Sequence, residues 1–291
     1  MYKAPVPTER EPFSLHDKTV VITGATSGIG EVAAIHLAEQ GARIVFVARD
    51  QKRADQTLQK LRQANGAADH AFHIADLSLL SEMKQVAGEI VREPVIDVLI
   101  NNAGALFNSR RETADGLERT FALNHMSYFV LTNLLLPRLK PGARVVSTSS
   151  GAHRRAQLDF ADLQSRRGPQ GFPVYAKSKL CNILFTRELA RRLEGTGVTA
   201  NCLHPGFVAT RFGDQSGGFL SWGVWLAKPF MGLSKEEGSK TIVYLASSPA
   251  VANVSGEYFY ECKVDTPSEA ARNDGDAKLL WDVSAEIAGL S

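Results

Sequence analysis

Cysteine is scarce in this chain of 291 residues. Its three cysteines, Cys181, Cys202 and Cys262, lie far apart, with no C-x-x-C pair and no histidine cluster at metal-ligand spacing. This pattern excludes a disulfide framework and a cysteine-ligated metal site, because both need closely matched sets of thiols. Free thiols are typical of a reducing compartment, so we expect a cytoplasmic protein without a metal.

The chain also lacks an excess of one charge and a long hydrophobic run. Its formal net charge is +2, whereas a dedicated nucleic-acid binder needs a concentrated basic face. We expect no integral membrane segment, and the polar, proline-containing residues 1–16 indicate a flexible N-terminal arm. With 44% hydrophobic and 22% charged residues in the chain, residues 17–291 are predicted to form a single domain.

Short β-branched stretches alternate with amphipathic stretches through most of residues 17–291. Such alternation favours parallel strands joined by right-handed helical crossovers. We predict an α/β, doubly wound Rossmann-type fold, with a mostly parallel sheet of about seven strands flanked by helices on both faces. The predicted strands span 19–24, 42–50, 70–76, 96–104, 143–150, 198–206 and 255–261, and the predicted helices span 28–41, 51–66, 79–93, 116–139, 171–193 and 234–248.

A glycine-rich turn, TGATSGIG, joins the first predicted strand to the first predicted helix. Gly24, Gly28 and Gly30 follow a G-x-x-x-G-x-G spacing, which differs from the G-x-G-x-x-G fingerprint. Glycines at such a turn permit positive φ and let the backbone approach a pyrophosphate, while the helix N-terminus offers unpaired N–H groups. The turn therefore indicates a dinucleotide site, with a plain connecting turn as the alternative.

Polar residues also follow the third and fourth predicted strands. Asp76 ends the third strand, and Asn101, Asn102 and Gly104 of NNAG end the fourth. Ligands of such sheets bind at the carboxyl ends of the strands. We expect Asp76 to accept from the adenine amino group and NNAG to line the nicotinamide ribose. The alternative role for Asp76 is a cap for the next helix.

The end of the second predicted strand bears on the choice of cofactor. An NAD site usually holds a carboxylate there, whereas this strand closes with Ala48 and continues with Arg49. A guanidinium binds a phosphate well, and Arg53 adds a second charge nearby. These residues favour NADP(H) over NAD(H), with Asp50 as a ribose ligand in the opposing interpretation.

At this point the chain resembles the short-chain dehydrogenase/reductase family over about residues 17–262. The matching segments occur in order: TGATSGIG, NNAG, Asn124 in FALNHMSYF, Ser150 in VVSTSSGAH, YAKSK, and HPGFVAT. The stretch from YAKSK onward and the C-terminal tail are most similar to the retinol dehydrogenase-type branch, without its hydrophobic N-terminal anchor. The resemblance implies an oxidoreductase that is either a homodimer or a monomer.

The resemblance places the catalytic groups on Asn124, Ser150, Tyr175 and Lys179. Tyr175 and Lys179 stand four residues apart on a predicted helix, so they share one face. A nearby ammonium favours the phenolate, and we expect it to lower the pKa of Tyr175 so that the phenol can act as general acid and base. Ser150 is expected to stabilise charge on the substrate oxygen, with Ser149 as the alternative serine. The resemblance implies that Asn124 holds a water in a proton relay.

The turn HPGFVAT is predicted to complete the cofactor site, with Pro205 and Gly206 shaping the turn and Val208 and Thr210 binding the nicotinamide carboxamide. The predicted cofactor-binding residues are Gly24, Thr26, Ser27, Gly28, Ile29, Gly30, Arg49, Arg53, Asp76, Leu77, Asn102, Ala103, Gly104, Tyr175, Lys179, Pro205, Gly206, Val208 and Thr210.

An apolar segment after this turn is the main source of information on the substrate. Residues 211–234 carry Phe219, Trp222 and Trp225, and we expect a lid that contacts a lipophilic substrate together with Ser150. A surface packing helix and a peripheral membrane contact are the alternatives. The basic segment between Ser150 and Tyr175 is expected to rim the pocket or to cover helix faces that family members use for dimerisation.

Taken together, the sequence predicts an NADP(H)-dependent oxidoreductase that interconverts an alcohol and an aldehyde or ketone on a bulky apolar substrate. Two other classes stay open. One is a catalytically silent NADP(H)-sensing regulator, which would need no proton donor. The other is a sugar-nucleotide epimerase or dehydratase, whose longer chains and T-G-x-x-G-x-x-G motif fit this sequence poorly.

Overall fold

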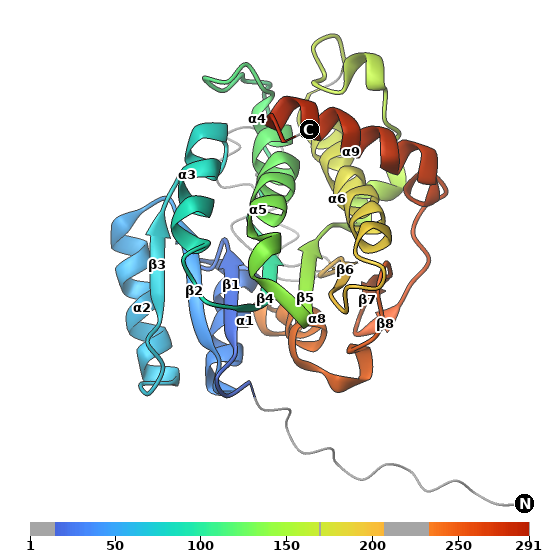
Figure 1. Ribbon diagram of the computed structural model, residues 1–291. Helices are drawn as coiled ribbons and strands as arrows, with labels where there is room; N and C mark the ends of the chain where they lie inside the picture. The colour runs from blue at the N-terminus through green and yellow to red at the C-terminus, as the bar shows by residue number, and fades with distance from the viewer. Residues whose placement is uncertain (1–14, 169, 207–232, 291) are drawn as a thin grey trace, which may run out of the picture.

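A computed structural model describes residues 15–168, 170–206 and 233–290. Its centre is an eight-stranded sheet in the order β3-β2-β1-β4-β5-β6-β7-β8 (Figure 1). The seven strands β1 to β7 pair in parallel, and β8 pairs antiparallel with β7. The strands are β1 Thr19–Thr23, β2 Arg43–Ala48, β3 Ala71–Ile74, β4 Ile96–Asn101, β5 Leu139–Thr148, β6 Thr199–Leu203, β7 Tyr258–Tyr260 and β8 Lys263–Val264.

Helices cover both faces of the sheet and bury a separate apolar core on each. The inner strand β1 contributes to both, since Val21 belongs to one core and Val20 and Ile22 to the other, as expected for alternating side chains on a strand. One face carries α1 Gly28–Glu39, α2 Gln51–Ala64 and α8 Lys235–Ser247, and the other carries α3 Leu80–Ile90, α5 Ser127–Leu135, α6 Phe172–Arg192 and α9 Asp274–Ala288. This is the predicted doubly wound fold.

The predicted helix 116–139 is divided in the structure. Glu118 caps a short helix, α4 Arg119–Phe121, by accepting from the Phe121 N–H. A π-helical segment, η1 Ala122–Met126, follows and leads into α5. Shorter 3-10 segments are η2 Leu136–Arg138, η3 Gly151–Arg155, η4 Phe160–Asp162, η5 Pro249–Val251 and η6 Ala270–Arg272.

Two further features differ from the sequence-based expectation. Leu15, inside the predicted arm, is buried and donates its N–H to the Gln40 carbonyl at 2.8 Å. The C-terminal helix α9 was not predicted, although Asn273 caps its start and Gly289 ends it in the left-handed conformation. None of the helices in the described part of the chain is long and apolar enough to cross a bilayer.

Candidate active site

The order of the strands reverses between β1 and β4. Hydrogen bonds join the turns that follow these two strands. The Thr23 hydroxyl accepts from the Asn102 and Ala103 N–H groups, both at 3.0 Å, and the Asn102 amide donates to the Thr23 carbonyl. Gly24 has φ +72°, and a Cβ there would lie 2.9 Å from the Ala103 Cα. A Cβ on Gly30 would overlap the Asn102 amide and the Gly24 carbonyl. Only glycines permit this approach.

The remaining turn residues lead directly into α1. Thr26 is half-buried, Ser27 is exposed, and Gly28 begins the helix with φ +64°. The Ser27 side chain makes no capping hydrogen bond, and Ile29 packs against the core on the α1 face. The N-cap side chain of α1 therefore does not cap the first N–H groups of the helix, which is compatible with a pyrophosphate site.

The charged residues that follow β2 have different roles. Asp50 caps α2, because its carboxylate accepts from the Arg53 N–H at 2.8 Å. Arg49 and Arg53 both have exposed side chains. The carboxylate that would favour NAD(H) is thus engaged by the helix, and the two guanidinium groups remain accessible.

Asp76 forms a side-chain turn before α3, but the alternative prediction that it caps this helix is wrong, because the N-cap position is Leu79. One carboxylate oxygen, Oδ1, accepts from the Ser78 N–H at 2.9 Å and from the Ser78 hydroxyl at 2.7 Å. The Asp76 N–H donates to Glu82, and Leu77 beside it is buried. Oδ2 makes no hydrogen bond with the described residues, so the turn with Ser78 leaves one carboxylate oxygen for an adenine contact.

Helix α6 brings Tyr175 and Lys179 to the end of β5. The Lys179 ammonium lies 5.7 Å from the centre of the Tyr175 ring and donates to the Thr148 carbonyl at 2.9 Å. Ser150 follows β5 and hydrogen-bonds Tyr175. The neighbouring Ser149 is buried and donates its hydroxyl to the Lys179 carbonyl at 2.7 Å. Ser150 is therefore the serine that faces Tyr175.

Burial is the largest influence on the pKa values of Tyr175 and Lys179. It raises the pKa of Tyr175 well above its ordinary value, and the hydrogen bond with Ser150 opposes that rise. Burial lowers the pKa of Lys179 to about 7. The expected depression of the Tyr175 pKa is wrong for this structure, because burial of the ring is the largest influence on it.

Asn124 lies in the π-helical segment and bridges three parts of the site. Its amide nitrogen donates to the Ala105 carbonyl at 3.0 Å and to the Ser178 hydroxyl at 2.9 Å, while its oxygen accepts from the Ala105 N–H. A Cβ on Gly104 would lie 3.2 Å from the Asn124 oxygen and 3.4 Å from the Lys179 nitrogen. The predicted tetrad and the NNAG turn therefore meet at one place.

Two residues of this cluster were missed by the sequence analysis. Ser178 donates its hydroxyl to the Tyr175 carbonyl at 2.7 Å and accepts from Asn124. The Thr148 carbonyl accepts from Lys179 and from Asn182. Ser178 stands three residues after Tyr175 and next to Lys179, a spacing that could have identified it. A backbone acceptor such as Thr148 leaves no signal in the sequence.

The turn after β6 is described only in part. Pro205 and Gly206 are half-buried, and Gly206 has φ +78° and donates its N–H to His204 at 3.1 Å. Of the predicted lid, 211–234, only Leu233 and Ser234 are described, and Ser234 caps α8. The predicted contacts Val208, Thr210, Phe219, Trp222 and Trp225 lie outside the described residues.

Comparison with known proteins identifies the family of this chain. Residues 18–217 match the short chain dehydrogenase family, and the chain belongs to that family of nicotinamide-dependent oxidoreductases. It is 41% identical to retinol dehydrogenase 14 of Mus musculus, covering 96% of this chain and 88% of that protein.

Solved structures show the same fold. A putative uncharacterized protein from Mycobacterium paratuberculosis is 31% identical, with a TM-score of 0.78 and 96% of each chain covered. A blue fluorescent protein from a metagenomic library, solved in complex with NADPH, is 28% identical with a TM-score of 0.67, covering 84% of this chain and 96% of that one.

Proposed function

We propose that this protein is an NADP(H)-dependent oxidoreductase that interconverts an alcohol and an aldehyde or ketone on a bulky apolar substrate. The observation that carries the proposal is the meeting of Tyr175, Ser150, Lys179 and Asn124 beside the glycine turn. A proton donor and a dinucleotide cradle at one site are what carbonyl reduction needs. A cofactor-sensing regulator would need only the cradle.

The glycine turn fits a nicotinamide dinucleotide, because Gly24 and Gly30 let the turns after β1 and β4 pack closely together beside the N-terminus of α1, where a pyrophosphate can bind. When bound, this cofactor supplies or accepts the hydride. Tyr175 then gives a proton to the substrate oxygen during reduction and takes it back during oxidation. Ser150 donates a hydrogen bond to that oxygen while negative charge develops.

Lys179 and Asn124 are proposed to return the proton to Tyr175. The ammonium of Lys179, with its pKa lowered to about 7 by burial, can release a proton near neutral pH. Asn124, fixed by Ala105 and Ser178, would hold the water that links Lys179 to solvent. The Lys179 ammonium would also bind the hydroxyls of the nicotinamide ribose.

The preference for NADP(H) rests on Arg49 and Arg53 and on the engagement of Asp50 by α2. We expect Arg49→Ala to weaken NADPH binding by about 1.5–3 kcal/mol, the range for a lost hydrogen bond to a charged group. NADH binding should change little, because NADH has no phosphate at this position. Fluorescence titration of both cofactors measures this, and equal losses for both would contradict the preference.

The lipophilic substrate is inferred from the relatives named retinol dehydrogenases and from the apolar residues predicted in 211–234. A cytoplasmic location is supported by the free thiols at Cys181, Cys202 and Cys262. We further propose that residues 17–291 act as one domain, with a homodimer and a monomer both open.

A panel of aldehydes, ketones and secondary alcohols, assayed with both cofactors at the nicotinamide absorbance band, tests the activity. Turnover of long-chain or ring-containing substrates with NADPH, and little with short polar ones, is the expected result. NADPH binding without turnover of any carbonyl would favour the regulatory alternative. Activity on a sugar nucleotide would favour the epimerase alternative.

A further inference from the structure

Arg119 stands apart from the other half-buried arginines because its guanidinium has no hydrogen-bond acceptor among the described residues. Its Nε is buried without a partner, and its guanidinium carbon lies 3.5 Å from the centre of the Phe107 ring. By contrast, Arg43 donates to Glu93 and Arg138 donates to a backbone carbonyl. A guanidinium that is held by stacking and has no acceptor among the described residues has N–H donors that can bind a ligand.

Hydrogen bonds place Arg119 near the adenosine end of the candidate cofactor site. Asp115 accepts from the Leu80 N–H at 2.8 Å, so the segment before Arg119 lies against the start of α3, four residues after Asp76. The Arg119 N–H donates to the Arg111 carbonyl at 2.9 Å. The charges of Asp76 and Arg49 also act on Arg119, so Arg119 lies near the residues that follow β2 and β3, where Asp76 is expected to meet the adenine.

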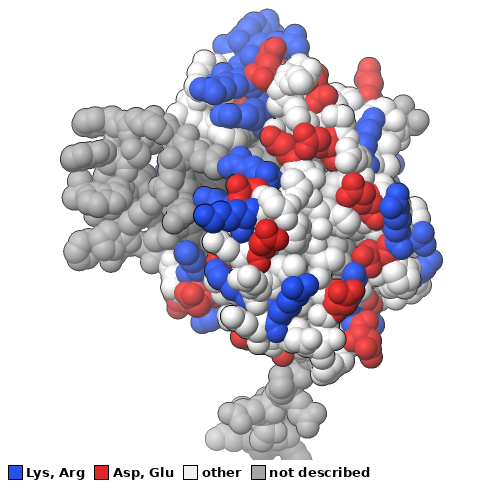
Figure 2. Space-filling model, turned by 90° about the vertical axis from the view of Figure 1, so that its left-hand side faces the viewer, with Lys and Arg blue, Asp and Glu red and all other residues white. Residues whose placement is uncertain are grey.

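Two cations and two anions act on this guanidinium. Burial, together with the charges of Arg111 and Arg49, lowers the pKa of Arg119, against the opposing effect of Glu118 and Asp76. Figure 2 shows Lys and Arg side chains gathered near the top of this side of the molecule, the end to which the carboxyl ends of the strands point.

The carboxylates in this region are engaged by the fold. The two oxygens of Glu118 accept from the Thr120 hydroxyl and the Phe121 N–H, and Asp76 holds Ser78. Neither carboxylate forms an ion pair with Arg119 among the described residues. A bound dianion would supply the acceptor that Arg119 lacks among the described residues.

We propose that Arg119, held against Phe107, is a second cation for the 2′-phosphate of NADP(H) and acts together with Arg49. This inference rests on the proposed function and adds a specificity-determining residue to it. Arg49 reaches the phosphate from the end of β2, and Arg119 reaches it from the segment after β4. Phe107 acts as a positioning residue, because stacking fixes the plane of the guanidinium.

The test uses the full chain and compares Arg119→Met with Arg62→Met, which removes an exposed charge at the far end of α2. Dissociation constants for NADPH, NADH, adenosine 2′-monophosphate and adenosine 5′-monophosphate are measured by calorimetry. We expect Arg119→Met to weaken NADPH and the 2′-monophosphate about tenfold, with NADH and the 5′-monophosphate within about twofold of wild type. Arg62→Met should leave all four unchanged.

Arg119→Lys keeps the charge and should retain part of the NADPH affinity, and melting temperatures identify any variant that is misfolded. Equal losses for NADPH and NADH, or no loss for either, would overturn the role of Arg119 while leaving wild-type NADPH selectivity intact. A wild-type protein that binds NADH as tightly as NADPH would instead overturn the cofactor preference itself.

Discussion

Burial strongly shifts the pKa of Lys179 in the candidate site. Its side chain is buried, and its one hydrogen bond to a described residue runs to the Thr148 carbonyl. Desolvation disfavours the ammonium and lowers its pKa from 10.5 to about 7. Nearby Tyr175 is buried in its neutral form for the same reason. Lys179 can therefore release its proton near neutral pH, whereas the raised pKa of Tyr175 favours its protonated phenol.

This burial has a consequence for stability. Between about pH 7 and pH 10 the unfolded chain keeps a proton on Lys179 that the folded chain releases, so the free energy of unfolding should rise with pH in this window. We expect the wild type to gain stability relative to Lys179→Met as pH increases from 7 to 10. Urea unfolding at several pH values measures this. Parallel stability curves for the two proteins would contradict a lowered pKa.

Among the structural elements, the strands and their carboxyl-end residues were the most predictable. β1 is a continuous β-branched run, β2 is rich in β-branched residues, and the glycine turn marks where α1 begins. The predicted helix 116–139 was inaccurate because Glu118 caps the chain late and Asn124 sits in a π-helical turn. Such a turn depends on long-range contacts, here with Ala105 and Ser178, that a periodic pattern does not contain.

The close packing of the glycine turn before α1 leads to a prediction. Gly30→Ala should abolish measurable NADPH binding and lower stability by about 1–3 kcal/mol, because the added Cβ would overlap the Asn102 amide and the Gly24 carbonyl. Gly88→Ala in α3 is the matched control: it has no atom within 4 Å of the new Cβ, and should raise stability by about 0.5–1 kcal/mol. Unchanged NADPH binding in Gly30→Ala would contradict the cradle.

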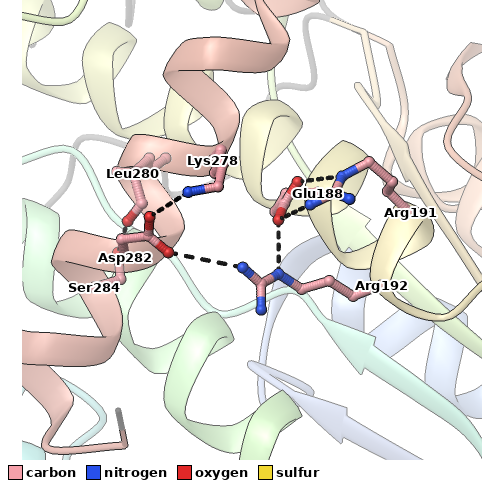
Figure 3. A network of polar contacts seen from close by, with 7 residues as sticks. All are labelled: Glu188, Arg191, Arg192, Lys278, Leu280, Asp282 and Ser284. Carbon is pink, nitrogen blue, oxygen red and sulfur yellow. Dashed lines mark hydrogen bonds and ion pairs between the residues drawn. The ribbon is translucent and has the colours of Figure 1, made fainter.

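On the scale of the whole molecule, α9 closes the helical layer that holds the tetrad. Trp281 packs between Phe129 of α5 and Phe185 of α6, with ring centroids 4.9 Å and 5.8 Å away. Figure 3 shows Glu188 held by Arg191 and Arg192, and Arg192 reaching Asp282 of α9. The C-terminal helix thus supports the outer side of the helix that carries Tyr175 and Lys179. The charge pattern of α9 in the sequence did not indicate that this helix would contact α6.

Truncating the centre of this contact should weaken the entire fold. Trp281→Ala is expected to destabilise the protein by about 3–5 kcal/mol, the usual range for a large buried aromatic side chain. Leu279→Ala on the same helix is the control, because Leu279 is 45% exposed, and should cost less than about 1 kcal/mol. Chemical unfolding compares the two. Similar losses would mean that α9 does not anchor the layer.

The most direct test of the account is turnover by Tyr175→Phe with NADPH and an apolar aldehyde that the wild type reduces. This change removes one hydroxyl from a buried ring and leaves the glycine turn intact. We predict that turnover is lost while the NADPH dissociation constant stays within about threefold of wild type, since the phenolic proton serves the substrate oxygen. Turnover like that of the wild type would contradict the assignment of Tyr175 as the proton donor.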